Sequence, residues 1–446
     1  MRGLRSTLAL LVVLVALGAY IYFVTWKQPA DTGSKQEKVF ASLGADKIDE
    51  LTVKSESGDV TTVKKDGDVW KVVSPIDAKA SESTVSGITG ALSNLEIVRV
   101  IDPNPASLSE FGLEKPRIEV QFKTGGQPAG RVYIGDKTPT GASYYALKDD
   151  DKRVFLIASY QDTAFNHSTF DLRDKALVTV LRDKTNTIDV TSEGATTVLT
   201  KKDKEWRVTS PIDARADFSS SEAIIGRVES AQMKSIVSEN ASAADLKQYG
   251  FDKPSASVTI NFEGASASIA FGSAADDQSV YARDPSRPMV VTVEKSLADD
   301  FKKKPEDFRR RDVFDFRSFN ASHAELSWAG KSMVLERVKT EGDKPDDWKR
   351  TTPSEKVLDR SKVETLLTGL ADIRATSFKS STAGTGLDAP ALTVYMKYDQ
   401  SRLEERASFG QSGTEAHASR PDDTGAMVIE ADKLTEALKT LDELIQ

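Results

Sequence analysis

The sequence contains no cysteine. Disulfide bonds, thiol nucleophiles, cysteine-ligated zinc and iron–sulfur clusters are therefore excluded. A lipidated N-terminal cysteine is excluded for the same reason. Any attachment to a membrane must use the polypeptide itself.

Histidine is almost as scarce, with only His167, His323 and His417 in 446 residues. They lie far apart in unrelated sequence contexts, so a shared metal site would require an improbable convergence of segments. No His-Glu-x-x-His or Gly-x-Ser-x-Gly stretch occurs. The stretch 329–332 resembles the end of a phosphate-binding loop, but Glu325 holds the position of its first glycine, and a strand fits better. The sequence predicts no catalytic residue, no metal site and no cofactor.

A net positive charge is also missing, because the sequence has 60 lysines and arginines and 68 acidic residues, which gives a formal charge of −8. Nucleic-acid binders usually present a basic face that offsets phosphate charge, so no nucleic-acid partner is expected. The length predicts several domains, because a chain of this size exceeds a single core.

Long apolar runs are absent, except for one at residues 8–24. As a helix this run spans roughly 26 Å, which matches the hydrocarbon thickness of a bilayer. Basic residues precede it, so the positive-inside rule predicts a cytoplasmic N-terminus and an exported body. The residues expected at the membrane interface are Arg2, Arg5, Tyr20, Tyr22 and Trp26.

The alternative for this run is a cleaved signal peptide, with a small-residue site near Ala16–Gly18. With a retained anchor, residues 1–26 form the cytoplasmic tip and transmembrane helix. Residues 27–38 are polar and form a tether that keeps the body near the membrane.

One short pattern recurs in the body. Trp70–Ala78 returns at Trp206–Ala214 and, more faintly, at Trp348–Pro353, with spacings of 136 and 142 residues between the tryptophans. We interpret the recurring residues as a structural signature of one unit used three times. Its members are Trp70, Pro75, Asp77, Trp206, Pro211, Asp213, Trp348 and Pro353.

The surrounding patterns predict the fold of each unit. Alternating strands flank a hairpin turn at Asp66-Gly67. A helix should begin after the N-cap residues Ser81, Asp217 and Asp359 and pack its apolar stripe on the tryptophan face. Meander strands follow. Segments 159–175 and 295–312 read as polar helices, and 432–445 as a C-terminal amphipathic helix.

The predicted fold class is therefore α+β, with an N-terminal transmembrane helix followed by three tandem, homologous, mostly antiparallel modules. The expected modules are residues 39–175, 176–312 and 313–446, the last being divergent.

Several charged groups admit two interpretations. Asp77 and Asp213 could be an acid–base pair or cation ligands, or they could cap turns. Residues 149–151 could attract calcium or form a solvated hairpin turn. The runs 302–304 and 309–311 could meet lipid headgroups or an acidic partner, or lie on a mixed-charge helix. The second interpretation is preferred for each.

Together, the Trp-x-Val-x-Ser-Pro-Ile-Asp-Ala segment, the helix after it and the Phe-Gly-Leu-x-x-Pro element at 111–116 resemble the bacterial family DUF4340. The resemblance covers the first two units well and the third partially, because Ser354-Glu355-Lys356 replaces Ile-Asp-Ala there. It implies an exported protein anchored at its N-terminus. It also implies a link to ABC-type transport systems of the gliding-motility kind, but no catalytic or binding residue.

The expected function is that of a non-enzymatic scaffold or accessory subunit of a bacterial envelope complex, such as an ABC-type transporter. The expected location is the inner membrane, as a single-pass protein with its body in the periplasm and a protein partner in the envelope. The alternative is a periplasmic protein that binds a small molecule, glycan or lipid. A hydrolase that uses carboxylates is the third hypothesis.

Overall fold

The computed structural model describes residues 37–149, 151–340 and 346–446. The expected anchor, its interface residues Arg2, Arg5, Tyr20, Tyr22 and Trp26, and most of the tether lie outside these residues. Within the described residues no helix is both long and apolar enough to cross a bilayer. The anchor therefore stays a prediction.

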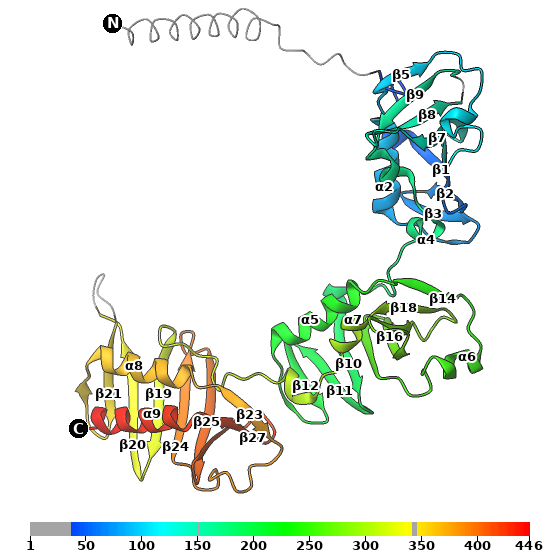
Figure 1. Ribbon diagram of the computed structural model, residues 1–446. Helices are drawn as coiled ribbons and strands as arrows, with labels where there is room; N and C mark the ends of the chain where they lie inside the picture. Colours follow the sequence, from blue (N-terminus) through cyan, green and yellow to red (C-terminus); the bar gives the residue numbers. More distant parts are fainter. Residues whose placement is uncertain (1–36, 150, 341–345) are drawn as a thin grey trace, which may run out of the picture. The chain divides into compact units, whose positions relative to one another are not determined.

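Three nine-stranded antiparallel sheets form the body, so the expected α+β class is confirmed. We call each sheet with its helices a module. Every sheet repeats one strand order: β4-β3-β2-β1-β6-β7-β8-β9-β5 in the first module, with the equivalent order in the others (Figure 1). This repetition supports three tandem modules, whose exact limits stay a prediction.

The strands of the first module are β1 (Ile48–Lys54), β2 (Val60–Asp66), β3 (Val69–Ser74), β4 (Ala78–Lys79), β5 (Arg99–Asp102), β6 (Ile118–Thr124), β7 (Gln127–Lys137), β8 (Ser143–Lys148) and β9 (Val154–Ala158). Those of the second are β10 (Thr185–Ser192), β11 (Ala195–Lys202), β12 (Glu205–Ser210), β13 (Ala214–Arg215), β14 (Ser235–Ser238), β15 (Ala256–Phe262), β16 (Ala265–Ala274), β17 (Ser279–Arg283) and β18 (Val290–Glu294). Those of the third are β19 (Ala321–Trp328), β20 (Lys331–Val338), β21 (Asp347–Thr352), β22 (Lys356–Val357), β23 (Ala375–Lys379), β24 (Leu392–Tyr398), β25 (Leu403–Ser412), β26 (Glu415–Ser419) and β27 (Ala426–Ile429).

One main helix covers each sheet: α2 (Glu82–Ser93), α5 (Phe218–Glu229) and α8 (Arg360–Ala371). Each begins at its expected N-cap, because the side chains of Ser81, Asp217 and Asp359 accept hydrogen bonds from backbone N–H groups of the first turn. Their apolar stripes are buried with the tryptophans, as expected. The core of each module thus lies between the sheet and this helix.

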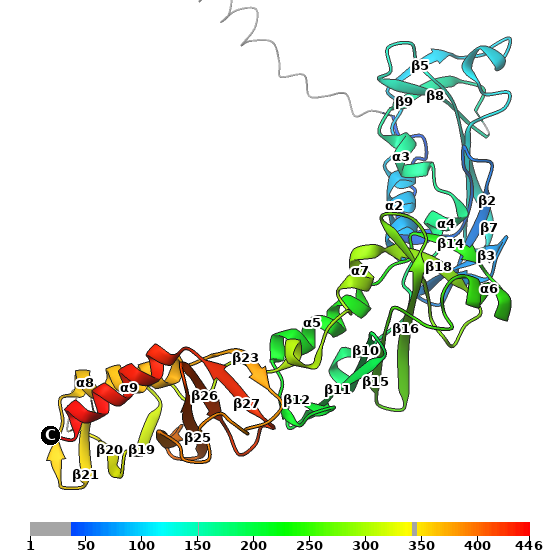
Figure 2. The same ribbon diagram turned by 60° about the horizontal axis from the view of Figure 1, so that its bottom comes forward.

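The remaining helices are short, apart from α9 (Ala431–Leu444), which packs beside α8 on the third sheet (Figures 1 and 2). They are η2 (Ala45–Lys47), η3 (Ser109–Phe111), α3 (Gln161–Phe165), α4 (Thr169–Leu172), η4 (Arg182–Lys184), α6 (Ala243–Gln248), α7 (Lys295–Asp299) and η5 (Pro305–Phe308). The expected C-terminal helix is confirmed. The polar segments 159–175 and 295–312 are instead broken into short helices, and residues 309–311 lie outside any helix.

Two kinds of strand were not expected from the sequence. Two-residue strands β4, β13 and β22 follow the prolines and end one edge of each sheet. Strands β5, β14 and β23 follow the main helix and end the other edge. The two-residue strands are too short for a period-two pattern to identify them, and β5, β14 and β23 show no strict alternation of buried and exposed residues.

A pair of glycines recurs where each meander begins. In the second module Gly250 has a φ of +84°, and a Cβ atom on Gly272 would lie 2.1 Å from the carbonyl oxygen of Tyr249. Gly272 therefore lets β16 pass directly over the turn at 249–251. This turn is important for the outer face of the second sheet.

By internal contacts the chain divides into two compact units, one ending at Lys175 and the other beginning at Ala176. The second unit contains both the second and the third module. The junction between these two modules can therefore be described in atomic detail.

Candidate functional site at the junction of the second and third modules

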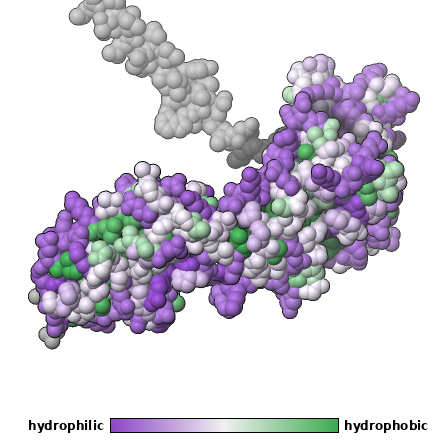
Figure 3. All heavy atoms as spheres, turned by 90° about the horizontal axis from the view of Figure 1, so that it is seen from below, coloured by the Kyte–Doolittle hydropathy of each residue, from purple (hydrophilic) through white to green (hydrophobic). Residues whose placement is uncertain are grey.

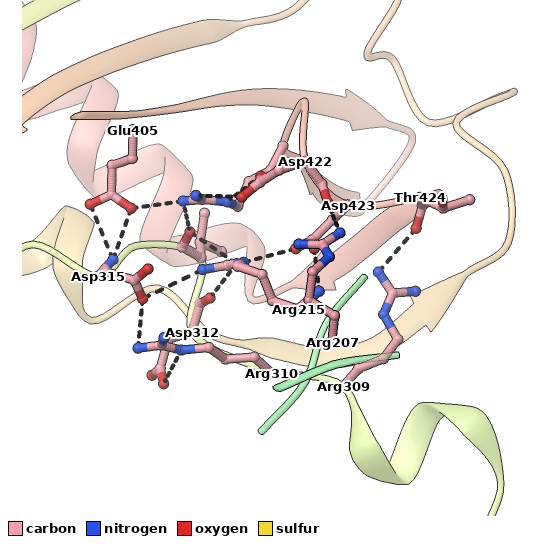
Figure 4. A network of polar contacts seen from close by, with 12 residues as sticks. Arg207, Arg215, Arg309, Arg310, Asp312, Asp315, Glu405, Asp422, Asp423 and Thr424 are labelled. Carbon is pink, nitrogen blue, oxygen red and sulfur yellow. Dashed lines mark hydrogen bonds and ion pairs between the residues drawn. The ribbon is translucent and has the colours of Figure 1, made fainter. Parts of the chain in front are cut away.

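The turn between β26 and β27 lies against the β12–β13 edge of the second sheet (Figure 4). The backbone N–H of Thr424 donates to the carbonyl of Asp213 over 2.8 Å, and that of Arg215 donates to Oδ1 of Asp423 over 2.6 Å. Nη2 of Arg207 donates to the carbonyl of Asp422 over 2.6 Å. The third module thus covers the edge of the second sheet, where unpaired backbone groups would otherwise face solvent.

A buried ion pair lies at the centre of this contact. Nε of Arg215 is 3.0 Å from Oδ2 of Asp423, and the two side chains are only 8% and 4% exposed. Nη2 of Arg215 also donates to the carbonyl of Asp312 over 2.9 Å. Buried charges are tolerated when they are paired and fully hydrogen-bonded, and this pair meets that requirement.

A second buried carboxylate continues the network inside the third module. Glu405, whose side chain is 1% exposed, accepts hydrogen bonds from the backbone N–H groups of Asp315 and Phe316 and from Nη1 of Arg420 over 2.7 Å. Arg420 also donates to the carbonyl of Val313 and to the carboxylate of Asp422. Glu405 and Arg420 therefore fix both the connecting segment and the turn that reaches the second module.

The charge states of the turn follow from these contacts. Burial alone would lower the pKa of Arg420, but its hydrogen bonds to Asp422 and Glu405 outweigh burial and raise the pKa. Burial alone would likewise raise the pKa of Asp422, but the hydrogen bond from Arg420 and the charges of Arg420 and Arg215 lower it. Both groups are therefore charged at neutral pH.

The segment that connects the two modules belongs to both. Arg309 forms a bridge with Ala216 in the second module, and the backbone N–H of Val313 donates to the carbonyl of Ile373 in the third. The buried guanidinium of Arg309 lies 4.1 Å from the centre of the Phe378 ring and donates to the carbonyl of Thr424 over 3.0 Å. Burial lowers the pKa of Arg309. The segment is held from both sides over five residues, which leaves little length for a hinge.

The recurring tryptophans lie in the cores of their modules, and Trp206 also lines a hollow beside the junction. Trp70, Trp206 and Trp348 are buried, and Nε1 of Trp206 donates to Glu222 over 2.9 Å. The prolines that follow them, Pro75, Pro211 and Pro353, are exposed and each follows a cis peptide bond.

The two recurring aspartates are in different modules, and both are exposed. Asp77 lies in the first module. Asp213 lies at the junction, where its Oδ1 accepts hydrogen bonds from Nε and Nη2 of Arg207. This differs from the expected cap of a turn, because an arginine side chain rather than a backbone N–H is the donor.

The three histidines also have separate surroundings. His167 is half-buried, and burial lowers its pKa. His323 lies between Glu336 and Glu325, at 2.6 and 3.1 Å, on the outer face of the third sheet. His417 is fully buried. The part of the chain that the structure describes contains no group of three or more His, Asp or Glu residues arranged to hold a metal ion.

Sequence reasoning missed Arg215, Glu405, Arg420 and Asp423. Arg215 and Asp423 are 208 residues apart, and no local periodicity indicates such a pairing. The run 309–311 is a local signal for this segment, but its composition predicts a mixed-charge helix. In the structure it is part of the non-helical segment that connects the two modules.

Two hollows flank the network. One of about 270 Å³ is lined by Trp206, Arg207, Arg215, Phe218 and Arg310, among others. The other, of about 430 Å³, is lined by Tyr395, Glu404, Glu405, Arg406 and Arg420, among others. The charged lining residues are bonded to other groups of the protein, so their hydrogen bonds and ion pairs hold the two modules together. These residues are Arg207, Arg215, Glu405 and Arg420.

Comparison with known proteins gives a family but no activity. The model of DUF4340, described as a domain of unknown function, matches residues 70–205 and 206–390. Both matches begin at a signature tryptophan, inside a sheet, so the family unit runs from the middle of one sheet into the next. A comparison with curated proteins finds no match.

Among solved structures the chain aligns with a DNA polymerase sliding clamp from Pseudomonas aeruginosa. The identity is 9% and the TM-score 0.17, over 88% of this chain and 93% of that chain. A score this low supports no argument about fold or function. The family match covers more than half of the sequence in two consecutive copies, and the chain therefore belongs to the DUF4340 family.

Proposed function

We propose that this protein is a non-enzymatic scaffold or accessory subunit of a bacterial envelope complex. In this proposal residues 1–26 anchor it in the inner membrane, and its homologous modules lie in the periplasm. A transporter of the ABC type, of the gliding-motility kind, is the complex that the family resemblance suggests. The protein partner belongs to the envelope.

The observation that supports the proposal is that the buried charged residues at the junction bond to one another and to the backbone of the chain. Arg215, Asp423, Glu405 and Arg420 are almost fully buried, and each is bonded to other groups of the chain. These groups hold the second and third modules in one arrangement. A fixed arrangement of modules suits a protein that positions partners.

The surface supports mainly polar contacts. On the face drawn in Figure 3, hydrophobic residues form small separate patches within a largely hydrophilic surface. Short edge strands other than β13, which the third module covers, provide further backbone groups for a partner strand.

Crosslinking of the full-length protein in intact membranes, followed by affinity purification, tests the proposal. We expect a defined set of envelope proteins to be recovered with the wild-type chain. Recovery should fall for an Asp423→Ala variant, because it loosens the module junction, and remain for the exposed control Asp277→Asn. Recovery of the protein alone after efficient crosslinking would contradict the proposal.

A further inference from the structure

The outer face of the second sheet contains a hollow of about 460 Å³, and its floor has small side chains where the sister modules have larger ones. Its floor is formed by strands β15 and β16, where Thr259 and Ser268 lie opposite each other and their hydroxyl groups are 2.9 Å apart. Its wall includes Phe251, Pro254 and Arg283. The size falls in the range of small-molecule sites.

In the first module the positions opposite each other are Gln121 and Arg131. Nη2 of Arg131 donates to Oε1 of Gln121 over 2.6 Å, and the guanidinium lies 5.7 Å from the centre of the Tyr133 ring. Long side chains therefore cover the face at this point. Ala270 occupies the position of Tyr133 in the second module, which widens the opening.

The third module also has larger side chains here, and they line a hollow of about 430 Å³. Its equivalent pair is Tyr395 and Arg406, and the guanidinium of Arg406 lies 5.2 Å from the centre of the Tyr395 ring. The second module alone places two small hydroxyl residues at this pair of positions. The floor of small hydroxyl residues is thus what departs from the repeat.

The wall of the hollow also differs from the other modules, because it has an aromatic residue where they have leucine. Phe251 follows the left-handed Gly250, where the other modules have Leu113 and Leu387 after Gly112 and Gly386. The ring is half-buried and offers a flat apolar surface at the rim. Aromatic faces with a few converging polar groups are the usual lining of sites for small organic ligands.

Arg283 adds donors to this wall. Its guanidinium lies 5.9 Å from the centre of the Phe251 ring, and its Nη2 donates to the carbonyls of Pro285 and Arg287 over 3.0 Å each. Its Nε is buried, without a hydrogen-bond partner among the described residues. A half-buried arginine whose donors are only partly used is suited to an oxygen-rich ligand.

We propose that this hollow binds a polyhydroxylated ring compound, namely a short segment of a glycan. The C–H face of a sugar ring would lie on Phe251 and the prolines. Its hydroxyl groups would exchange hydrogen bonds with Ser257, Thr259, Ser268 and the guanidinium of Arg283. Each serine or threonine hydroxyl both donates and accepts, as does each sugar hydroxyl, so the two sets are complementary. This inference stands independently of the proposed scaffold function.

The test uses the full-length protein on an array of neutral and acidic oligosaccharides, followed by titration with the oligosaccharide that is retained best. The filled variant Thr259→Gln/Ser268→Arg introduces the pair found in the first module. The matched control, Thr52→Gln/Thr62→Arg, places the same side chains at another cross-strand hydroxyl pair, 3.0 Å apart, on the first sheet. Circular dichroism confirms that both variants fold.

We expect wild type and control to bind alike and the filled variant to lose at least tenfold in affinity. Phe251→Leu installs the residue of both sister modules, so it should fold normally and weaken binding severalfold. Retention of no oligosaccharide by the wild type would overturn the proposal, and so would equal binding by the filled variant. Failure of this test leaves the crosslinking result for the scaffold function unaffected, so the two proposals fail separately.

Discussion

The second and third modules have equivalent sheet edges with different surroundings. The β12–β13 edge has Arg207 and Arg215, and a turn of the next module covers it. The β21–β22 edge has Lys349 and Val357 at these positions, and the side chain of Val357 is 66% exposed. At both edges the longer strand contains the signature tryptophan, and the signature proline precedes the two-residue strand. The difference indicates that recurring residues build each module, whereas the buried ion pair that joins the modules, Arg215 with Asp423, does not recur.

The largest effects should come from the recurring residues. Replacement of Trp348 by alanine should cost about 3–5 kcal/mol in the free energy of unfolding of its module, because it removes a fully buried ring and leaves a cavity. Trp206→Ala should cause a similar loss in the free energy of unfolding of the second module. Native-state hydrogen exchange, read module by module, measures this. The exposed Phe319→Ala is the control, and an equal loss from it would refute a core role for the tryptophans.

The junction should be the next most sensitive region. Asp423→Ala leaves the buried Arg215 without its carboxylate, at a cost of about 3 kcal/mol to the packing of the third module on the second. The double change Arg215→Met/Asp423→Ala should cost less than the sum of the single changes. Chemical denaturation of all three variants gives the coupling energy. Simple additivity would show that the ion pair does not join the modules.

A smaller effect should be shared by all modules. Ser81→Ala, Asp217→Ala and Asp359→Ala each remove the acceptor for a first-turn N–H group, with an expected loss of about 1 kcal/mol. Thermal unfolding measures it. Changes that differ greatly between modules would contradict the equivalence of the three helices.

The smallest effect concerns pH and should be confined to the junction. The pKa of Asp422 is lowered in the folded protein, so its contribution is fully present above about pH 4, the usual value of an aspartate. It is lost as the pH falls through the lowered folded value. The hydrogen-exchange protection factors of residues 419–426 should therefore fall between pH 5 and pH 3, and Asp422→Asn should remove this dependence. A pH response that survives this substitution would assign it to another group.

Much of the fold could be predicted from the sequence, because its signals are local. The turn at Asp66-Gly67, the three N-caps and the alternating meander strands each depend on neighbours a few residues away. The order of the strands within each sheet could not be predicted, since pairings such as β1 with β6 join segments that are distant in the sequence. The two-residue strands were missed because two residues cannot show a period.

The candidate sites could not be predicted from local sequence patterns, because their residues are also distant in the sequence. The partners at the junction come from three separate stretches, near 215, 312 and 420, and only the fold brings them together. The hollow depends on small residues at Thr259 and Ser268, and its significance emerges only when the modules are superposed strand by strand. A careful alignment of the three repeats could have identified both positions.

The central claim is that residues outside the repeat hold the second and third modules in one arrangement. Because the chain has no cysteine, Ser266→Cys, at an exposed position of β16, and Thr414→Cys, in an exposed turn of the third module, would be the only spin-labelling sites. Electron–electron double resonance should give one narrow distance distribution, which broadens when Asp423→Ala and Glu405→Gln are added. A broad distribution without those two changes, or an unchanged one with them, would contradict the claim.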